Sequence, residues 1–191
     1  MDSKVEISRV ASSIRSICTA ASQSLGSDCY THAALGQAVL RRLFVDSRIV
    51  TGTVAWRVGP GNSDILLHCP VPGAPPQPGA LAFHCWLLID DKHLFDSTTY
   101  QIPAKCKSLD EMDGYRTSVE WHPDYLYADI STVSPLADVI QHRAGMYFYD
   151  ESAYLHELIS STALPVDEDF VEIALTLYHN PEIKVLGPNQ L

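Results

Sequence analysis

The chain has 191 residues, 46% of them hydrophobic, which is enough for one domain with its own core and too few for two comfortable ones. Its formal net charge of -10 disfavours nucleic acid as a partner, because phosphate binding depends on clustered Lys and Arg. No apolar run reaches the roughly 18 to 20 residues that a membrane-spanning helix needs. The five cysteines are odd in number and irregularly spaced, which favours a reducing, cytoplasmic location over a disulfide framework.

The first part of the chain predicts two helices and a strand. Apolar residues recur every three to five positions over residues 5–25, which predicts an amphipathic helix and differs from a signal peptide. Gly26-Ser27-Asp28 breaks this helix and supplies capping residues for a second, mostly buried helix from Cys29 or Tyr30 to Phe44. Residues 48–58 are rich in Val, Ile, Thr and Trp and predict a strand.

The middle of the chain predicts a loop and a hairpin. Five prolines and two glycines between Pro70 and Gly79 predict an exposed loop, because proline lacks the N–H that helices and central strands use. Strands at 81–89 and 93–96 follow, joined by a tight turn. A strand at 146–149 and helices near 152–161 and 166–178 complete the pattern. Helices, hairpin-connected strands and further helices indicate an α+β fold, with helices on one side of an antiparallel sheet.

Cys29 stands at the predicted start of a helix. There it lies near unpaired backbone N–H groups and the positive end of the helix dipole, which lower a thiol pKa and stabilise an oxyanion. A lone free cysteine is more often a small buried apolar residue. Placement directly after Gly26-Ser27-Asp28 shifts the interpretation towards a nucleophile. His32, three residues further on, lies on the same side of the helix, and we expect it to be structural.

A candidate base and its orienting group occupy the predicted hairpin. Alternation along the first strand places His84 and Trp86 on one face and Cys85 on the other. Asp96 closes the second strand, within cross-strand reach of a His–Asp hydrogen bond. Taken singly, His84 and Trp86 are ordinary core residues and Asp96 is a cap or turn residue. Taken with Cys29, they supply a thiol, its base and the orienter of that base, which favours a catalytic triad.

These segments resemble the three core motifs of the transglutaminase-like (papain-like cysteine peptidase) superfamily, in a short bacterial-type form. That family has a helix-borne Cys, then His-x-Trp on one strand and Asp-x-Thr on the next. The resemblance covers residues 22–100, about half of the chain, and includes the strand at 48–52. It implies a single α+β domain over 1–191, with the Cys helix packed on an antiparallel sheet and further helices at the C-terminus.

The resemblance also implies the chemistry. Cys29 is the nucleophile, His84 the base and then the acid, and Asp96 orients the imidazole, with no cofactor. The chain departs from the family in having Cys85 after His84 and no clear second domain. It also lacks a calcium-binding pattern of spaced acids, which disfavours a calcium-dependent cross-linker.

Other positions are weaker candidates for the site. Papain-like peptidases carry a glutamine that donates to the oxyanion six positions before the cysteine, where this chain has Gln23; the alternative is a solvated end of the first helix. Tyr30, Trp56, Trp86 and the proline loop are candidate walls or lids. We expect Cys29 to attack a peptide or a small amide or acyl compound and to form a thioester, which water or an amine resolves. Hydrolysis, deamidation and acyl transfer are all open.

Two alternatives belong to other classes. A catalytically idle relative would serve as a protein-binding module, with all its cysteines slow to alkylate. A metal-dependent hydrolase would draw ligands from His68, Cys69, His84, Cys85 and His93, since zinc favours His and Cys. Adjacent residues on a strand point to opposite faces, and neither Cys-x-x-Cys nor His-x-x-x-His occurs, so a metal site is disfavoured.

Overall fold

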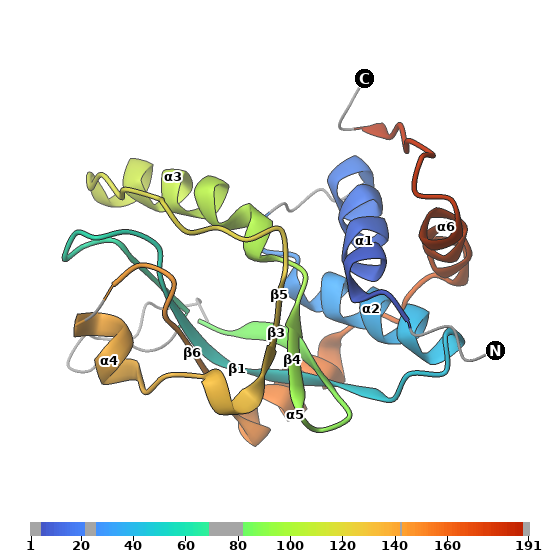
Figure 1. The fold of residues 1–191 in the computed structure, drawn as a ribbon, viewed down its shortest axis with the longest axis horizontal. Helices are drawn as coiled ribbons and strands as arrows, with labels where there is room; N and C mark the ends of the chain where they lie inside the picture. The colour runs from blue at the N-terminus through green and yellow to red at the C-terminus, as the bar shows by residue number, and fades with distance from the viewer. Residues whose placement is uncertain (1–4, 22–25, 69–81, 142, 189–191) are drawn as a thin grey trace.

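A computed structural model of the chain describes residues 5–21, 26–68, 82–141 and 143–188. Within these residues an antiparallel sheet of six strands runs through the molecule and carries helices on both faces (Figure 1). The strands are β1 (Ser47–Arg57), β2 (Ile65–His68), β3 (His84–Ile89), β4 (His93–Asp96), β5 (Leu126–Asp129) and β6 (Tyr147–Glu151). The helices are α1 (Ile7–Ala21), α2 (Cys29–Arg42), α3 (Ile102–Asp113), α4 (Leu136–Gln141), α5 (Ala153–Thr162) and α6 (Glu168–His179), with short 3-10 helices η1 (Thr99–Gln101) and η2 (Ile130–Thr132).

The long strand β1 organises the sheet, and β2 and β3 follow one another along the same edge of it. Gly52 pairs with His84 of β3 and with Glu151 of β6, so β3 and β6 take opposite edges of β1. Val54 pairs with His68 of β2 and also with β6, so β2 shares the edge of β3. His68 and His84 therefore lie opposite β1 positions two residues apart, although sixteen positions separate them along the chain.

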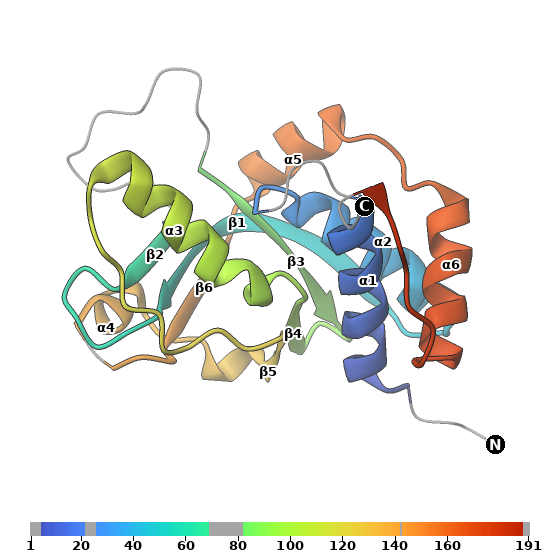
Figure 2. The same cartoon turned by 90° about the horizontal axis from the view of Figure 1, so that it is seen from above.

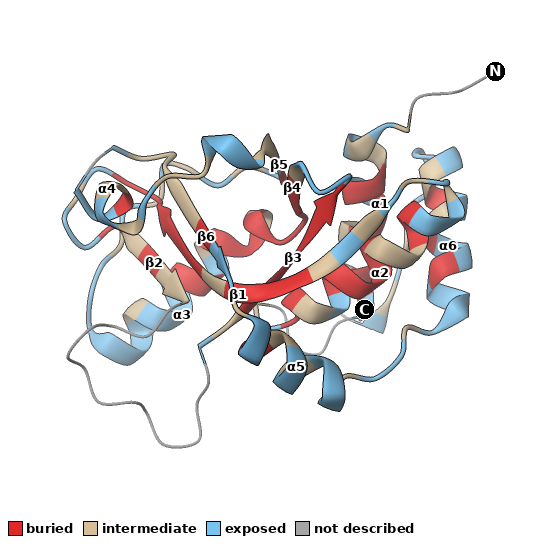
Figure 3. Ribbon diagram, turned by 90° about the horizontal axis from the view of Figure 1, so that it is seen from below, coloured by how far each residue is buried: buried red, intermediate tan, exposed pale blue. Residues whose placement is uncertain are grey.

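Strand β3 separates two hydrophobic cores. All of its residues are buried, and Figure 3 shows the strand in red along its length. Cys85 and Leu87 face a core made with α1, α2 and α6, helices that lie together in Figure 2. Trp86 and Leu88 face a second core, to which α3 contributes Ile102. Alternation along a strand sends successive side chains to opposite faces, so both faces of this sheet need a covering layer.

The expected elements at the start of the chain and in the hairpin are confirmed, with shifted ends. The strand at 93–96 has the predicted bounds, and the helix predicted from Cys29 ends at Arg42. The strand predicted at 146–149 pairs with β1 as β6. The proline loop at 70–79 lies outside the described residues. None of the described helices has the length and apolar character to cross a membrane.

The expectation that helices cover one side of the sheet is wrong. Helix α3 covers the second core, and the sequence did not reveal it because only Ile102, Lys105 and Cys106 of its twelve residues are buried. Three buried residues are too few to produce a clear helical periodicity of apolar residues in the sequence. The short elements β5 and α4 were missed for the same reason, since four and six residues carry little pattern.

We expect Gly52→Ala to destabilise the fold strongly. A Cβ at Gly52 would lie 1.9 Å from the backbone oxygen of Asp150, so β1 and β6 would have to separate where they pair. The expected loss is about 2–3 kcal/mol in the free energy of unfolding, measured by urea denaturation. Gly114→Ala is the control. It meets no atom within 4 Å and costs about 1 kcal/mol for its left-handed φ of 75°. Equal losses in the two variants would contradict this account of the β1–β6 contact.

Candidate active site

The three predicted site residues come together at the junction of α2, β3 and β4. Cys29 is the first residue of α2, His84 the first of β3 and Asp96 the last of β4. All three are buried, with exposed fractions of 6%, 0% and 1%. Cys85 and His84 both lower the pKa of the Cys29 thiol, and Cys29 and Cys85 belong to the same hydrophobic core.

His84 is held by Asp96 through one ring nitrogen. Its Nε2 lies 2.8 Å from Oδ2 of Asp96. The register pairs Leu88 with Leu94 and Leu87 with Phe95, so the next position places Asp96 opposite Trp86 and diagonal to His84. The sequence did not determine this register. Diagonal neighbours on one face of an antiparallel pair are within reach of long side chains, which is how the two groups meet.

The carboxylate of Asp96 is saturated with hydrogen bonds. Oδ1 accepts from the backbone N and from Oγ1 of Thr98, both at 2.8 Å. Oδ2 accepts from Tyr149 Oη at 2.7 Å as well as from His84. Tyr149 Oη in turn accepts from Trp56 Nε1 at 2.9 Å. Burial alone would raise the pKa of Asp96, but the charge and hydrogen bond of His84, with Thr98 and Tyr149, hold it well below its ordinary 3.8. Asp96 is therefore ionised.

The ionised Asp96 determines the tautomer of His84. A carboxylate only accepts, so the hydrogen between Asp96 and His84 belongs to Nε2 of the ring. In the neutral imidazole the other nitrogen, Nδ1, then carries the lone pair. Nδ1 is buried and has no hydrogen-bond partner among the described residues. The ring therefore carries an unpaired base at Nδ1, and Cys29 is among the groups that raise the pKa of His84.

The environment favours a thiolate–imidazolium pair. The largest cause of the lowered pKa of Cys29 is the hydrogen bond with Cys85; burial opposes it, and His84 and then Lys105 lower the pKa further. Burial would lower the pKa of His84, but the charge and hydrogen bond of Asp96, followed by those of Cys29, raise it overall. The contact with Cys29, with burial added, raises the pKa of Cys85 far above 9.0, so Cys85 stays a protonated donor.

The other described cysteines lack this activation. Burial raises the pKa of Cys18 to about 12 and that of Cys106 to about 11. Because the thiolate is the reactive form, Cys29 is the activated thiol among the four cysteines that the structure describes. Cys69 lies outside the described residues.

A buried polar network holds the start of α2 against the segment after β4. Asp28 Oδ1 accepts from Gln101 Nε2 at 3.0 Å, and Asp28 Oδ2 lies 3.6 Å from His32 Nε2. His32 Nδ1 lies 3.2 Å from Ser97 Oγ, and Gly26 N donates to Gln101 Oε1 at 3.2 Å. His32 is thus a structural residue, as expected. Asp28 occupies the expected N-cap position but makes no capping hydrogen bond, because its carboxylate faces Gln101 and His32.

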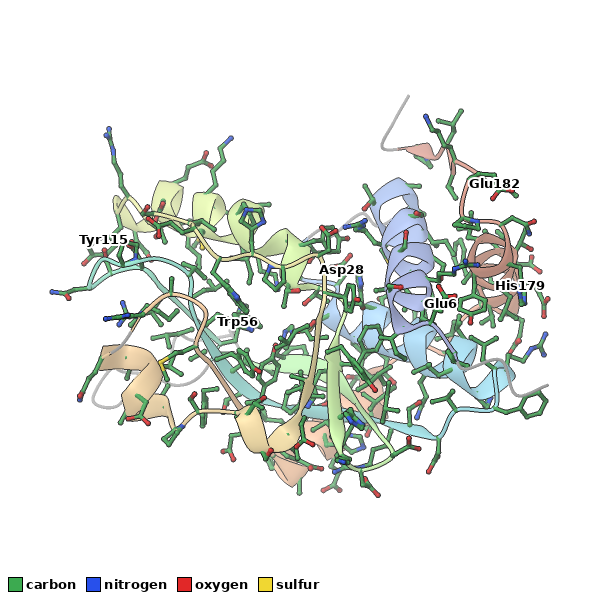
Figure 4. All side chains as sticks on the ribbon, in the orientation of Figure 1. Glu6, Asp28, Trp56, Tyr115, His179 and Glu182 are labelled. Carbon is green, nitrogen blue, oxygen red and sulfur yellow. The ribbon has the colours of Figure 1, made fainter. Side chains whose placement is uncertain are left out.

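The two candidate wall tryptophans support the imidazole. The ring centroid of Trp56 lies 5.0 Å from that of His84, edge-on, and that of Trp86 lies at 6.4 Å, nearly parallel. Trp56 is fully buried and Trp86 is 4% exposed. Figure 4 shows Trp56 between α3 and the sheet, with Asp28 near the start of α2. The two indoles therefore restrict the rotation of His84 from within the core.

Tyr30 lines a pocket of about 650 Å³ between α1, α2 and the connection from α5 to α6. Its apolar walls include Ile17, Leu164 and Phe170, and Asp28 lies at its rim beside the first turn of α2. The pocket therefore adjoins the residues on both sides of Cys29. Gln23, the candidate oxyanion donor, lies outside the described residues.

Among the candidate metal ligands that the structure describes, His93 lies apart from His68, His84 and Cys85. His68 lies beside His84, with ring centroids 5.9 Å apart. His93 pairs with Ile89 at the far end of β3 and stacks on Tyr127. The described residues hold no group of three or more His, Cys, Asp or Glu side chains placed to bind a metal ion.

Several residues of the site were not singled out from the sequence. Tyr149 and Lys105 come from β6 and α3, whose places in the fold the sequence did not reveal. Thr98 carries a local signal, because an Asp side chain commonly accepts from the backbone N–H two residues on.

Comparisons with known proteins bear on the fold. No family model matches the chain, and no curated protein matches it. A solved structure, the crystal structure designated genomics APC5867, superimposes with a TM-score of 0.59 at 14% sequence identity. The match covers 89% of this chain and 77% of that one. The fold and the comparison together define an α+β protein with a curved antiparallel sheet.

We expect Tyr149→Phe to destabilise the protein in a pH-dependent way. Burial raises the pKa of Asp96, whereas His84, Thr98 and, to a smaller extent, the hydrogen bond from Tyr149 lower it. A carboxyl group whose pKa is lower in the folded than in the unfolded protein stabilises the fold at a pH above its unfolded pKa, here near 3.8. This contribution is lost as the pH falls towards the pKa of the folded state. The variant should lose about 1–2 kcal/mol at pH 7 and less below pH 4, by urea denaturation.

The matched control is Tyr147→Phe, on the same strand. The Tyr147 hydroxyl lies 2.8 Å from Thr132 Oγ1 and makes no contact with Asp96. Its loss should be small and constant with pH. A cost for Tyr149→Phe that does not shrink on acidification would contradict the assigned hydrogen bond to the Asp96 carboxylate.

Proposed function

We propose that the protein is a cysteine-dependent acyl-transfer enzyme with a Cys29-His84-Asp96 triad, of transglutaminase-like (papain-like) type in fold and mechanism. The observation that carries the proposal is the ionised Asp96, which fixes the hydrogen of His84 on Nε2 and leaves Nδ1 free to act as a base. Cys29 is among the groups that raise the pKa of this imidazole. A nucleophile, its base and a third group that orients the base are the recurring parts of covalent acyl chemistry.

The reaction begins with a proton transfer. Nδ1 of His84 takes the proton of Cys29 Sγ to form the thiolate–imidazolium pair that the site favours, and the thiolate attacks the carbonyl carbon of an amide. Backbone N–H groups of the first turn of α2 are candidates to bind the resulting oxyanion, because the side chain of the N-cap residue Asp28 makes no capping hydrogen bond to them. The imidazolium then gives its Nδ1 proton to the leaving nitrogen, the C–N bond breaks, and an amine and a thioester on Cys29 result.

Release of the acyl group uses the same residues in reverse. Nδ1 of His84 takes a proton from water, and the hydroxide attacks the thioester carbonyl. The C–S bond breaks, the sulfur regains the proton from His84, and a carboxylic acid leaves. An amine in place of water gives acyl transfer. Asp96 stays ionised throughout and stabilises the imidazolium in both halves.

Selective alkylation tests the thiolate. With iodoacetamide at pH 7 we expect one fast-reacting cysteine, identified as Cys29 by peptide mass spectrometry. Its alkylation rate should persist well below pH 9.0, because the contacts with Cys85 and His84 lower its pKa. His84→Ala should slow the reaction by about tenfold or more, since the thiolate loses its partner. Cys18→Ala is the control and should leave the fast phase intact. Uniformly slow alkylation of every cysteine would contradict the proposal and favour a protein-binding role.

Acyl transfer itself requires a separate test. Incubation with an activated acyl ester should add one acyl group to Cys29, seen by mass spectrometry, and the adduct should disappear with time. Asp96→Asn should lower the turnover of this ester by on the order of a hundredfold or more, because the amide cannot stabilise the imidazolium. Thermal unfolding of the variant provides the control for folding. A stable Asp96→Asn protein with unchanged turnover would contradict the assigned role.

A further inference from the structure

A buried cation lies beside the candidate triad. Lys105, in the first turn of α3, is only 7% exposed. Its stem packs at Gly26, where a Cβ would lie 3.5 Å from Lys105 Cγ. Its Nζ lies 5.7 Å from the ring centroid of Trp56, and the same indole contacts His84. The side chain therefore extends from the connection that precedes Cys29 to the indole that supports the base.

Lys105 has no anionic partner within the described part of the chain. It makes no ion pair and no hydrogen bond there, and its contact with Trp56 is a cation–π interaction. A buried ammonium without a counter-charge is costly, and one aromatic face offsets only part of that cost. The buried Arg57 shows the usual solution, because its guanidinium donates to the backbone oxygens of Val139, Gly61 and Ile140.

The nearby carboxylate of Asp96 does not neutralise Lys105. All its hydrogen bonds go to His84, Tyr149 and Thr98, as described above. The charge of Lys105 acts on the Cys29 thiol instead. It lowers the pKa of Cys29, although the effects of Cys85, burial and His84 on that pKa are larger. Lys105 lies against Gly26, three residues before Cys29, and over Trp56, which contacts His84, so the ammonium stands beside both halves of the triad.

A second unpaired polar atom lies against the same indole. His68 packs edge-on against Trp56, with ring centroids 5.5 Å apart, and its buried Nε2 has no hydrogen-bond partner among the described residues. Burial first, and then the charges of Lys105 and His84, lower the pKa of His68 to about 3. His68 is therefore neutral at pH 7 and can donate one ring N–H. A monoanion with two oxygens satisfies this ammonium and this donor together.

We propose that Lys105 and His68 form a subsite for a carboxylate on the acyl substrate, so that the enzyme prefers acyl groups that carry a negative charge. This inference rests on the proposed function, because it takes Cys29 as the reacting atom. One ammonium and one neutral donor match the single charge of a carboxylate, whereas a phosphate dianion would be left undercompensated.

A pair of alkylating reagents tests the subsite. Iodoacetate carries a carboxylate where iodoacetamide carries an amide, and both react with the same thiolate. In the Lys105→Met variant the ratio of the iodoacetate rate to the iodoacetamide rate at Cys29 should fall roughly three- to tenfold, as loss of one nearby charge predicts. Lys105→Arg should restore most of the ratio.

Lys107→Met is the matched control. Lys107 is exposed on the same helix, so this variant makes the same change in net charge away from the site and should leave both rates unchanged. If Lys105 only stabilises the thiolate, the two reagents slow equally in Lys105→Met and the ratio stays constant. That result overturns the subsite while the triad stands.

A second measurement does not need a reactive thiol. Cys29→Ala is titrated with butyrate and with butyramide, and the Trp56 indole N–H is followed by NMR. We expect butyrate to shift this signal more than butyramide, and we expect Lys105→Met to remove the difference. Equal responses to the two compounds overturn the subsite whatever the alkylation shows. If Cys29 of the wild type alkylates slowly but butyrate still shifts the signal more than butyramide, the proposed acyl chemistry is contradicted and the anion subsite stands.

Discussion

The ion pair between His84 and Asp96 is the interaction on which the rest of the site depends. Four hydrogen bonds on one buried carboxylate keep Asp96 ionised, and they come from the base, the following turn and β6. The ionised state in turn decides which nitrogen of His84 carries the hydrogen. Tyr149 also accepts a hydrogen bond from Trp56, which fixes the hydroxyl that donates to the Asp96 carboxylate.

The short segment that follows β4 serves both partners of the proposed reaction. Asp96, the last residue of β4, orients the base, while Ser97 and Gln101 in the segment after it contact His32 and Asp28 at the start of α2. The thiol and the imidazole are therefore positioned by neighbouring residues of one stretch of chain.

Much of the site was predictable from local pattern. A cysteine after a helix-breaking segment, a histidine in an apolar strand and an aspartate closing the next strand each belong to an element that the sequence predicts. Tyr149 and Lys105 were not predictable in the same way. The place of Tyr149 depends on which edge of β1 its strand joins, and that of Lys105 depends on a helix with a short apolar stripe. Pairing partners and the sheet face that a weak helix covers are long-range properties, which local periodicity does not encode.

The residue types and their order follow from the chain alone: a thiol at a helix start, and then a His and an Asp on the two strands of a hairpin. Capping chemistry and strand alternation act over a few residues, so they can be inferred from the chain. Only the tertiary structure decided the register that makes His84 and Asp96 diagonal neighbours, the edge of β1 that brings His68 beside His84, and the approach of Lys105 to Trp56. Those arrangements follow from packing two cores against both faces of one sheet, and burial sets the protonation of the groups between them.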